Sequence, residues 1–384
     1  MTNGKLGVSA MLALVVAHCA GMIDLVALPV WVGALIGRFG FTPQQAGGLV
    51  TLFLLGAVVA SAVVSPRFNR IRPRLVAAGG FAVGAAAFGL ASTRTDFAGL
   101  GAMHALAGVS VGAALSAVHG TMGRTANPHR TFGIATIALG AFGIIALGAL
   151  PQLMIAQGGA ALFVALAVVM TVAALACAVL FPPVSVLVPE PDRDLSGLGA
   201  GVWLVILGIS AMTFNQSMVF SFVEVIGDAR GFAKGNVLAV LIALGIINFV
   251  LVGPAAMLLE KRLRPENVVR IGPAVQAAFA LVVTGASVFT VWAPVAALFV
   301  GVQIFTHTFA FGLLARMDPS GRAVAATPAM LMSGAALGPI VGGVLSQQLG
   351  HATLGYAAVV VALGSITLFS MGCARSRGAQ GVAA

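Results

Sequence analysis

Charged residues are scarce in this sequence. Asp, Glu, Lys and Arg together make up 8% of its 384 residues, whereas a soluble globular domain carries about 25%. A chain of this length with so little charge cannot cover a water-exposed surface, which excludes a soluble globular protein. Hydrophobic residues make up 60% of the chain and its mean hydropathy is +1.07, so we expect lipid to surround most of it.

Cysteines are few, and the common catalytic motifs are missing. The three cysteines, Cys19, Cys177 and Cys373, lie far apart, in or at the ends of apolar runs. No disulfide or metal pattern can be built from them. The sequence has no Walker, metal-ligand or nucleophile-elbow motif either. We therefore expect no enzymatic activity, no bound metal and no cofactor, with a proton gradient as the energy source.

Long, continuous apolar runs dominate the sequence instead. They lack the period-2 alternation of a transmembrane barrel, and a spanning helix needs about 20 apolar residues. We predict an all-α membrane protein with about 12 transmembrane helices. The expected spans lie near Val8–Leu35, Ala46–Pro66, Leu75–Ser92, Ala98–Gly120, Phe132–Ile155, Ala160–Pro182, Val202–Ile226, Val237–Leu259, Val268–Thr290, Val295–Ala315, Ala326–Leu349 and Thr353–Gly372.

The placement of the basic residues predicts the orientation of the chain. With the N-terminus in the cytoplasm, only Arg38, Arg94, Arg230 and Lys234 of the 20 Lys and Arg residues fall in outward-facing loops. An excess of basic residues in cytoplasmic loops is the usual topology signal of helical membrane proteins. We therefore expect both termini in the cytoplasm and a bacterial-type inner-membrane location. The net charge of +10 is explained by topology, and no nucleic-acid partner is expected.

The chain divides into two related halves. A polar stretch at 184–201 is predicted to be a cytoplasmic linker between an N-terminal six-helix half, 1–183, and a C-terminal half with a short tail, 202–384. The sequence Arg70-Ile-Arg-Pro73 returns as Arg262-Leu-Arg-Pro265, 192 positions later and in the same loop of the second half. Two pseudo-symmetric halves with a substrate between them are a known transporter architecture. Nothing in the sequence requires an oligomer, so we expect a monomer.

Several segments of the chain resemble one transporter family. The first span contains Asp24-Leu-Val-Ala-Leu-Pro29, and the sequence Gly-Phe-Thr-Pro-Gln-Gln-Ala-Gly at 40–47 leads into the second. Together with the basic loop that follows and a glycine-rich eleventh span, they resemble the major facilitator superfamily over essentially the whole chain. The start is similar to that of drug-efflux and sugar-efflux members. This resemblance implies the major facilitator fold and proton-coupled antiport by alternating access.

The loop after the second span carries part of this resemblance. The family has a glycine, an aspartate and several arginines there. Arg70 and Arg74 match this pattern, while Asn69 stands at the acidic position. The equivalent loop of the second half has Glu260 close to Arg262. The resemblance implies that these loop residues take part in the conformational change of transport.

Glycines in the fourth and eleventh spans carry another part of the resemblance to this family. Proton-coupled members have an arginine shortly before a glycine pair in the fourth span, and this chain has His104 there. The eleventh span resembles the Gly-Pro-Gly-Gly motif that antiporters usually have in the fifth. Small residues let helices approach closely in lipid. The residues assigned to helix packing on this basis are Gly108, Gly112, Gly334, Gly338, Pro339 and Gly342.

Asp24 is the first candidate for a functional site. It lies well inside the first span, where a carboxylate costs about 2.5–3.5 kcal/mol on insertion scales. Such a residue usually faces a cavity and carries a proton or binds a cation, so we assign Asp24 to proton coupling and to substrate binding. The alternative is a carboxylate that pairs with a neighbouring helix or with the backbone.

The seventh and tenth spans hold further polar candidates. The 192-residue offset maps Asp24 onto Gln216, which predicts a substrate-binding cluster at the matching depth, and the tenth span has a histidine with polar neighbours. Histidine titrates near neutrality, so His104 and His307 could relay protons with Asp24. Interhelical hydrogen bonding is the alternative for all of these side chains. The substrate-binding candidates besides Asp24 are Asn215, Gln216, Ser217, Gln303, Thr306 and His307.

Other polar and aromatic residues have more ordinary interpretations. His18 is expected on a different helix face from Asp24, His119 near the membrane border, and Glu224 at the outer interface. Gln276 and Asn248 are secondary candidates for the lining of the pathway. The tryptophans Trp31, Trp203 and Trp292 fall near predicted membrane borders, as in an aromatic belt.

The charges inside the spans limit the substrate. No predicted span has a Lys or Arg near its middle, whereas a carrier of strong anions usually presents a cation there. The leading hypothesis is therefore a secondary active transporter that exports a small neutral, cationic or amphipathic solute. Uptake of a sugar or monocarboxylate metabolite is a second hypothesis. A non-transporting sensor or a lipid-translocating protein on the same scaffold is a third.

Overall fold

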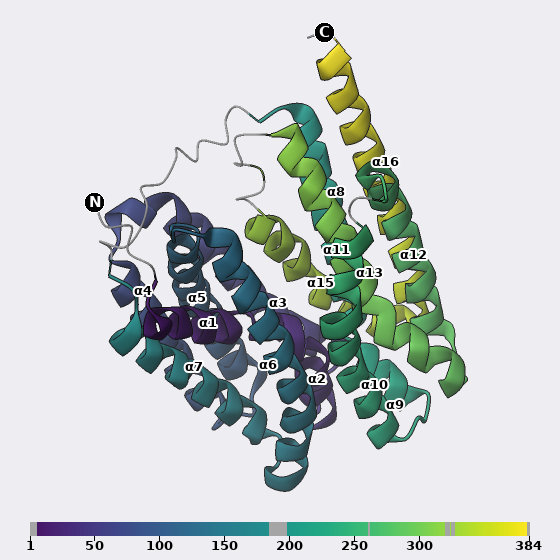
Figure 1. The fold of residues 1–384 in the computed structure, drawn as a ribbon. Helices are drawn as coiled ribbons and strands as arrows, with labels where there is room; N and C mark the ends of the chain where they lie inside the picture. Colours follow the sequence, from purple (N-terminus) through teal and green to yellow (C-terminus); the bar gives the residue numbers. More distant parts are fainter. Residues whose placement is uncertain (1–5, 184–197, 260–261, 319–322, 324–326, 382–384) are drawn as a thin grey trace. The chain divides into compact units, whose positions relative to one another are not determined.

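The fold is helical throughout the part of the chain that the structure describes. The computed structural model describes residues 6–183, 198–259, 262–318, 323 and 327–381, and all regular elements there are helices (Figure 1). Twelve helical segments are long and apolar enough to cross a membrane. The prediction of an all-α protein with about 12 transmembrane helices is confirmed. Glu260, which was assigned to a conformational loop, lies outside the described residues.

The described chain forms two compact units. The first comprises 1–41 and 49–193, and the second comprises 42–48 and 194–384. Most of the predicted linker, 184–197, lies outside the described residues, and the next helix begins at Ala200. Residues 42–48, which contain the first turn of the second span, were predicted to belong to the N-terminal half and here join the second unit.

The first unit contains the first six spans, except for residues 43–48 at the start of α3. The first span is divided into two helices, and a short 3-10 helix follows the second span. The elements are α1 (Val8–Gly21), α2 (Ile23–Gly37), α3 (Pro43–Val64), η1 (Ser65–Arg70), α4 (Pro73–Ala91), α5 (Phe97–Met122), α6 (Pro128–Gln157) and α7 (Ala160–Leu180).

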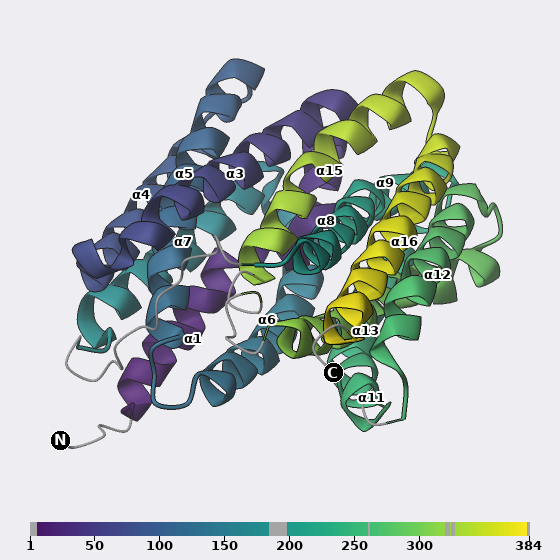
Figure 2. The ribbon, with the colours of Figure 1, turned by 90° about the horizontal axis from the view of Figure 1, so that it is seen from above.

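Within the first unit, α4 packs against α5 and α7, and α1 packs against α7 (Figures 1 and 2). Aromatic side chains fill the interior, and Trp31, Phe53 and Phe88 are fully or almost fully buried. In contrast, Ile145 and Val179 are 66% and 70% exposed. Exposed aliphatic side chains on spanning helices are expected to contact lipid.

The second unit contains the last six spans, two of which are interrupted. Its elements are α8 (Ala200–Phe220), α9 (Val223–Ala229), α10 (Lys234–Ile247), η4 (Asn248–Val252), α11 (Gly253–Leu259), α12 (Pro265–Gly285), α13 (Phe289–Met317), α15 (Thr327–Leu349) and α16 (Ala352–Gly381). The element η4 is a π-helix rather than an α-helix.

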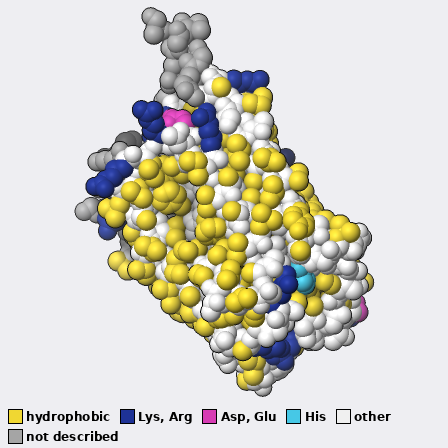
Figure 3. All heavy atoms as spheres, turned by 90° about the vertical axis from the view of Figure 1, so that its right-hand side faces the viewer, with side chains coloured by type: hydrophobic (Ala, Val, Ile, Leu, Met, Phe, Trp, Pro, Cys, Tyr) yellow, Lys and Arg dark blue, Asp and Glu magenta, His cyan; other side chains and the backbone are white. Residues whose placement is uncertain are grey.

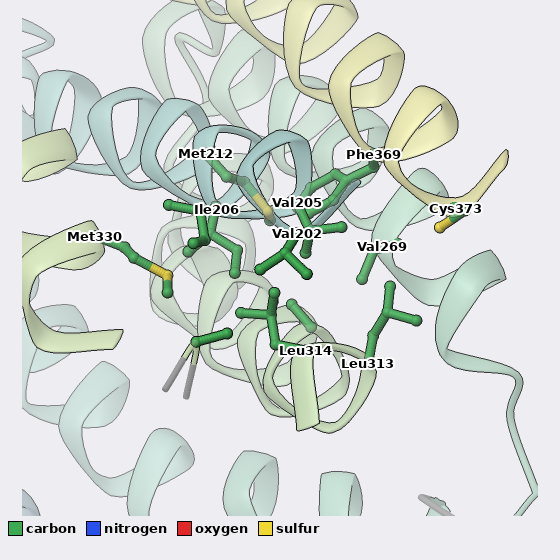
Figure 4. Close-up of a cluster of buried hydrophobic side chains, with 13 residues drawn as sticks. Val202, Val205, Ile206, Met212, Val269, Leu313, Leu314, Met330, Phe369 and Cys373 are labelled. Carbon is green, nitrogen blue, oxygen red and sulfur yellow. The ribbon is translucent and has the colours of Figure 1, made fainter. Parts of the chain in front are cut away.

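Helix α8 lies between α15 and α16 in the second unit, and α12 packs against α16 and α13 (Figure 2). Side chains from these five helices point toward one another in a closed apolar cluster (Figure 4). Val205, Leu314 and Phe369 have no exposed surface in this cluster. Burial of such side chains stabilises a helix bundle by dense packing.

The outer surface of the second unit is apolar. The face in Figure 3 carries a broad area of hydrophobic side chains, with Lys and Arg gathered toward its ends. Val360 on α16 is 69% exposed and Ile271 on α12 is 60% exposed. This pattern fits a bilayer that covers the middle of the helices and leaves the basic ends in water.

Two tryptophans contradict the aromatic-belt prediction. Trp31 and Trp292 are both 0% exposed, and Trp292 Nε1 donates a hydrogen bond of 3.1 Å to the Val283 carbonyl. Trp203 is 42% exposed, as expected at a border. The two buried indoles find hydrogen-bond acceptors inside their units, which removes the need to place the N–H group at the membrane surface.

Candidate functional site

Asp24 lies at a break in the first transmembrane span. Helix α1 ends at Gly21 and α2 begins at Ile23, with Met22 between them in a non-helical conformation. Asp24 is in the first turn of α2 and is 5% exposed. The N-terminus of a helix carries partial positive charge, and half-helix termini inside the membrane form ion and substrate sites in transporters. The break therefore gives this buried carboxylate a favourable electrostatic setting.

Glu224 has the equivalent position in the second unit. Helix α8 ends at Phe220 and α9 begins at Val223, and Glu224 lies in the first turn of α9. The residue before α9, Phe222, has φ −109° and ψ 5°, close to the φ −108° and ψ 17° of Met22. Each acid is the second residue of the helix that follows the break.

This position revises the predicted correspondence between the halves. The 192-residue offset, taken from a loop, paired Asp24 with Gln216. The helix breaks pair Asp24 with Glu224, 200 positions later, and Gln216 lies in α8 before the break. Loops and turns of different lengths shift the offset along the chain, so a match in one loop does not carry over to a span. Glu224 is partly buried rather than freely exposed at the interface.

A buried hydrogen-bond network connects four helices of the second unit. Asn215 Nδ2 on α8 donates to Gln276 Oε1 on α12, at 3.3 Å, and to the Ala358 carbonyl on α16, at 3.2 Å. Gln276 Nε2 donates to Gln303 Oε1 on α13 at 2.7 Å. None of the three carboxamide side chains is more than 2% exposed. For Asn215 and Gln303, these are the interhelical hydrogen bonds that are the alternative to substrate binding.

The network ends at His307. Gln303 Nε2 donates to Thr213 Oγ1 at 3.0 Å and contacts His307 Nε2. Thr213 donates its own hydrogen to the Ile209 carbonyl at 2.9 Å, so its oxygen acts as an acceptor toward Gln303. A carboxamide nitrogen can only donate, so His307 Nε2 is the acceptor in this contact.

The remaining candidates of the second unit lie on different faces. Ser217 donates to the Ala335 carbonyl on α15 at 3.0 Å. Thr306 donates to Val302 within its own helix at 2.8 Å and packs against Gly272. Gln216 is partly buried. The predicted substrate-binding residues therefore do not form one cluster, because neighbouring residues on a helix point in different directions.

His104 is enclosed in the first unit. Its Nδ1 lies 2.7 Å from the Leu100 carbonyl, and its Nε2 lies 3.2 Å from Nε1 of Trp31. Because an indole nitrogen only donates, His104 Nε2 accepts and Nδ1 donates. The ring is 0% exposed and makes edge contacts with Phe88 and Phe163. This is the arrangement of a satisfied core histidine, the alternative to proton coupling.

The structure brings together two histidines that the sequence did not connect. His18 Nδ1 on α1 lies 2.9 Å from His119 Nε2 on α5, and the ring centroids are 5.1 Å apart. His119 also makes an edge contact with Phe132. The two residues are 101 positions apart, so no local pattern could have predicted the pair.

The basic loop of the first unit is held by contacts with neighbouring segments of the chain. Asn69 Oδ1, at the position where the family has an acid, accepts a hydrogen bond from Arg124 Nη2. The Arg124 guanidinium lies 4.6 Å from the centre of the Phe68 ring, and partial burial lowers the pKa of this guanidinium. Arg74 Nε donates to the Ala178 carbonyl near the end of α7 at 3.0 Å. Arg70 and Arg262 are exposed.

The glycines assigned to helix packing lie at close helix contacts. A Cβ atom at Gly108 or Gly112 on α5 would collide with the backbone of α3, at Phe53 and Ala57. On α15, Gly334 faces the backbone of Ser210 on α8. Two further glycines of α15, Gly338 and Gly342, face Ser217 and Met218 of α8. Pro339 lies within α15, next to Gly338.

The residue types that bind metals are spread over the described part of the chain. No three or more His, Cys, Asp or Glu side chains gather there in a way that could hold a metal ion. The buried hydrogen-bond network of the second unit consists of carboxamides, a hydroxyl and an imidazole.

Comparison with known proteins agrees with the helical architecture. Two solved transporters are similar to this chain over nearly their whole length. One is a bacterial homologue of the human lysosomal transporter Spinster, in an inward-facing and occupied conformation (TM-score 0.72, 14% identity, 96% of each chain covered). The other is the nucleoside transporter NupG (TM-score 0.71, 15% identity, 94% of this chain and 99% of that chain covered). Likeness at these identities shows the fold. No curated protein sequence matches the chain.

The family is shown by the sequence itself. The model of the Major Facilitator Superfamily matches residues 11–327, which is most of the 384 residues. The twelve candidate spans and the two compact units agree with this match. The chain therefore belongs to the Major Facilitator Superfamily.

Proposed function

We propose that this chain exports a small neutral, cationic or amphipathic solute in exchange for protons. The observation that carries the proposal is the place of Asp24, which is 5% exposed and lies in the first turn of the second helix of a broken span. Ionisable residues inside the membrane usually belong to substrate pathways or proton relays. We place the protein in the inner membrane as a monomer, with both termini in the cytoplasm.

Protonation of Asp24 is the proposed coupling step. The N-terminus of α2 favours the carboxylate, while burial in an apolar span favours the neutral acid. A change in hydration during alternating access shifts this balance, so the residue takes up a proton on one side of the membrane and releases it on the other. A cationic solute could exchange directly with that proton, since both are attracted by the same carboxylate.

The charge distribution supports the substrate class. The described spans carry no Lys or Arg in their central turns. The buried network of the second unit has only uncharged groups. A strong anion would therefore meet no compensating positive charge, whereas a neutral or cationic solute avoids that cost.

The test is flux through purified protein in liposomes. Ethidium represents a cationic amphipathic solute and uridine an uncharged one. A pH gradient should drive the flux of a transported solute, and Asp24→Asn should abolish the gradient-dependent part. The matched control is Asp96→Asn, because exposed Asp96 caps α5 by accepting from Gly99 N at 2.6 Å, and Asn is an equally good cap. Unchanged coupling in Asp24→Asn would refute the proposed role.

A second candidate is uptake of an uncharged, hydroxyl-rich metabolite such as a sugar or nucleoside. Two observations favour it: the carboxamide network of the second unit, and the fold likeness to the nucleoside transporter NupG. A monocarboxylate fits less well, because it would need a cation in the spans. Counterflow of labelled uridine and glucose in vesicles of known orientation separates uptake from export.

A further inference from the structure

A π-helix interrupts the eighth span. Helix α10 ends at Ile247, the π-helical turn η4 covers Asn248–Val252, and α11 begins at Gly253. A single π-turn inserts one extra residue into a helix and is rare, and such turns often occur at functional sites. It also alters the direction of the side chains that follow. The π-turn therefore suggests that the eighth span does more than cross the bilayer.

Asn248 begins this turn with an unsatisfied acceptor. Its Oδ1 atom is buried and has no hydrogen-bond partner among the residues that the structure describes. The oxygen faces Gly301 on α13, where a Cβ atom would come within 3.1 Å of it. A buried carboxamide oxygen without a donor is unfavourable by about 1–3 kcal/mol. A bound molecule that brings a donor to this oxygen would remove this cost.

The side chains of the π-turn lie in two different environments. Phe249, Val250 and Leu251 are 39%, 62% and 57% exposed, as expected of side chains that contact lipid. Asn248 and Val252 instead pack toward Gly301 of α13. Asn248 therefore lies on the protein side of the span, next to the helix that also carries Gln303 and His307.

The other polar side chains of the second unit differ from Asn248. Gln276 and Gln303 are bonded to each other and to their neighbours. Asn215 Oδ1 also lacks a donor in the described part, but Asn215 is 0% exposed and enclosed by α12 and α16. Asn248 is only partly buried as a residue, so a small rearrangement can expose its acceptor to a solute.

We propose that Asn248 is a solute-contacting residue of the second unit, whose carboxamide oxygen accepts a hydrogen bond from a hydroxyl or N–H group of the transported molecule. This inference rests on the proposed transport function and adds a specific ligand chemistry to it. The π-turn presents the carboxamide on the protein side of the span while the three following side chains remain in lipid. The solute replaces the missing donor.

Thiol accessibility tests this placement without knowledge of the substrate. The native cysteines, all buried, are first replaced by alanine. Asn248→Cys is then compared with Val250→Cys, a lipid-facing control on the same turn, in liposomes that contain the charged reagent 2-(trimethylammonium)ethyl methanethiosulfonate on both sides. Only a hydrated thiol ionises and reacts, so we expect Asn248→Cys to react at least about tenfold faster. Equal or slower reaction than the control would overturn the proposal.

Two further measurements guard against misfolding and against a structural role. Asn248→Leu should melt at the same temperature as the parent or higher, because it removes an unsatisfied polar group; loss of a structural hydrogen bond would instead lower the melting temperature by about 2–4 °C. Ethidium or uridine, whichever the flux assay shows to be transported, should slow the labelling of Asn248→Cys. A transported solute that leaves the labelling unchanged refutes this inference but not transport, and flux that fails while Asn248→Cys still reacts refutes only the proposed function.

Discussion

Asp24 and Glu224 are each the second residue of the helix that follows a break in a transmembrane span. One lies in the first span of the first unit and the other in the first span of the second unit. The residues before the two helices, Met22 and Phe222, have nearly the same backbone angles. The internal repeat of the chain is therefore a repeat of helix breaks with an acid in the following turn.

The two acids should respond differently to neutralisation. Glu224 is partly exposed, and Glu224→Gln removes the favourable interaction of its carboxylate with the N-terminus of α9, so we expect a destabilisation of at least about 0.3–1 kcal/mol. Asp24 is 5% exposed, so Asp24→Asn also removes the cost of burying a charge, and we expect a smaller destabilisation than for Glu224→Gln. Thermal unfolding of both variants in detergent measures this. Equal destabilisation by both substitutions would contradict the assignment.

The loop residue Asn69 offers a test by gain of charge. It accepts a hydrogen bond from Arg124, and Asn69→Asp would turn this into a charge-assisted bond. Exposed ion pairs contribute about 0.2–1 kcal/mol, so we expect a stabilisation of that size at low salt. The control Asn69→Ala should destabilise the loop. A gain that persists in 1 M salt would show that the effect is not electrostatic, since that salt reduces the screening length to about 3 Å.

His351 should make stability depend on pH. It lies between α15 and α16, its Nδ1 is 2.6 Å from Ser346 Oγ, and burial together with the nearby Arg230 guanidinium lowers its pKa in the folded protein. The unfolded chain therefore binds a proton more readily, with a pKa of about 6.5. Stability from this group is complete above that pH and declines as the pH falls through 6.5 toward the lower pKa of the folded state.

The measurement compares the parent with His351→Gln. The melting temperature of the parent should fall more between pH 7.5 and pH 5.5 than that of the variant. Gln can still hydrogen-bond Ser346 but does not titrate. The prediction is wrong if both proteins show the same pH profile.

Glycine packing can be tested with a matched pair of alanine substitutions. A Cβ atom at Gly112 would collide with the Ala57 backbone, whereas a Cβ atom at Gly89 meets nothing within 4 Å. Gly112→Ala should destabilise the first unit by about 1–3 kcal/mol through overpacking. Gly89→Ala should be neutral or stabilising by up to about 1 kcal/mol, because alanine favours the helix. Similar melting temperatures for the two variants would show that the α3–α5 contact adapts easily.

Hydropathy alone determined the class, the number of spans and their approximate bounds. A segment that is apolar all round must sit in lipid whatever its neighbours are, so the spans can be predicted from composition and length. The glycine contacts could also be predicted from the sequence, because glycine lets two helices approach closely. The breaks at Met22 and Phe222 and the π-turn at Asn248 left no such signal, because they change the backbone without changing hydropathy.

Only the tertiary structure decided which polar side chains meet. Asn215, Gln276 and Gln303 come from three helices and satisfy one another, and His18 reaches His119 across 101 positions. A sequence shows that a buried polar residue needs a partner but not which residue supplies it, since hydrogen bonds act over about 3 Å between helices that the chain connects only through distant loops. The sequence therefore determined that Asp24 is an acid inside a membrane, and the fold decided that it lies in the first turn of a helix after a break.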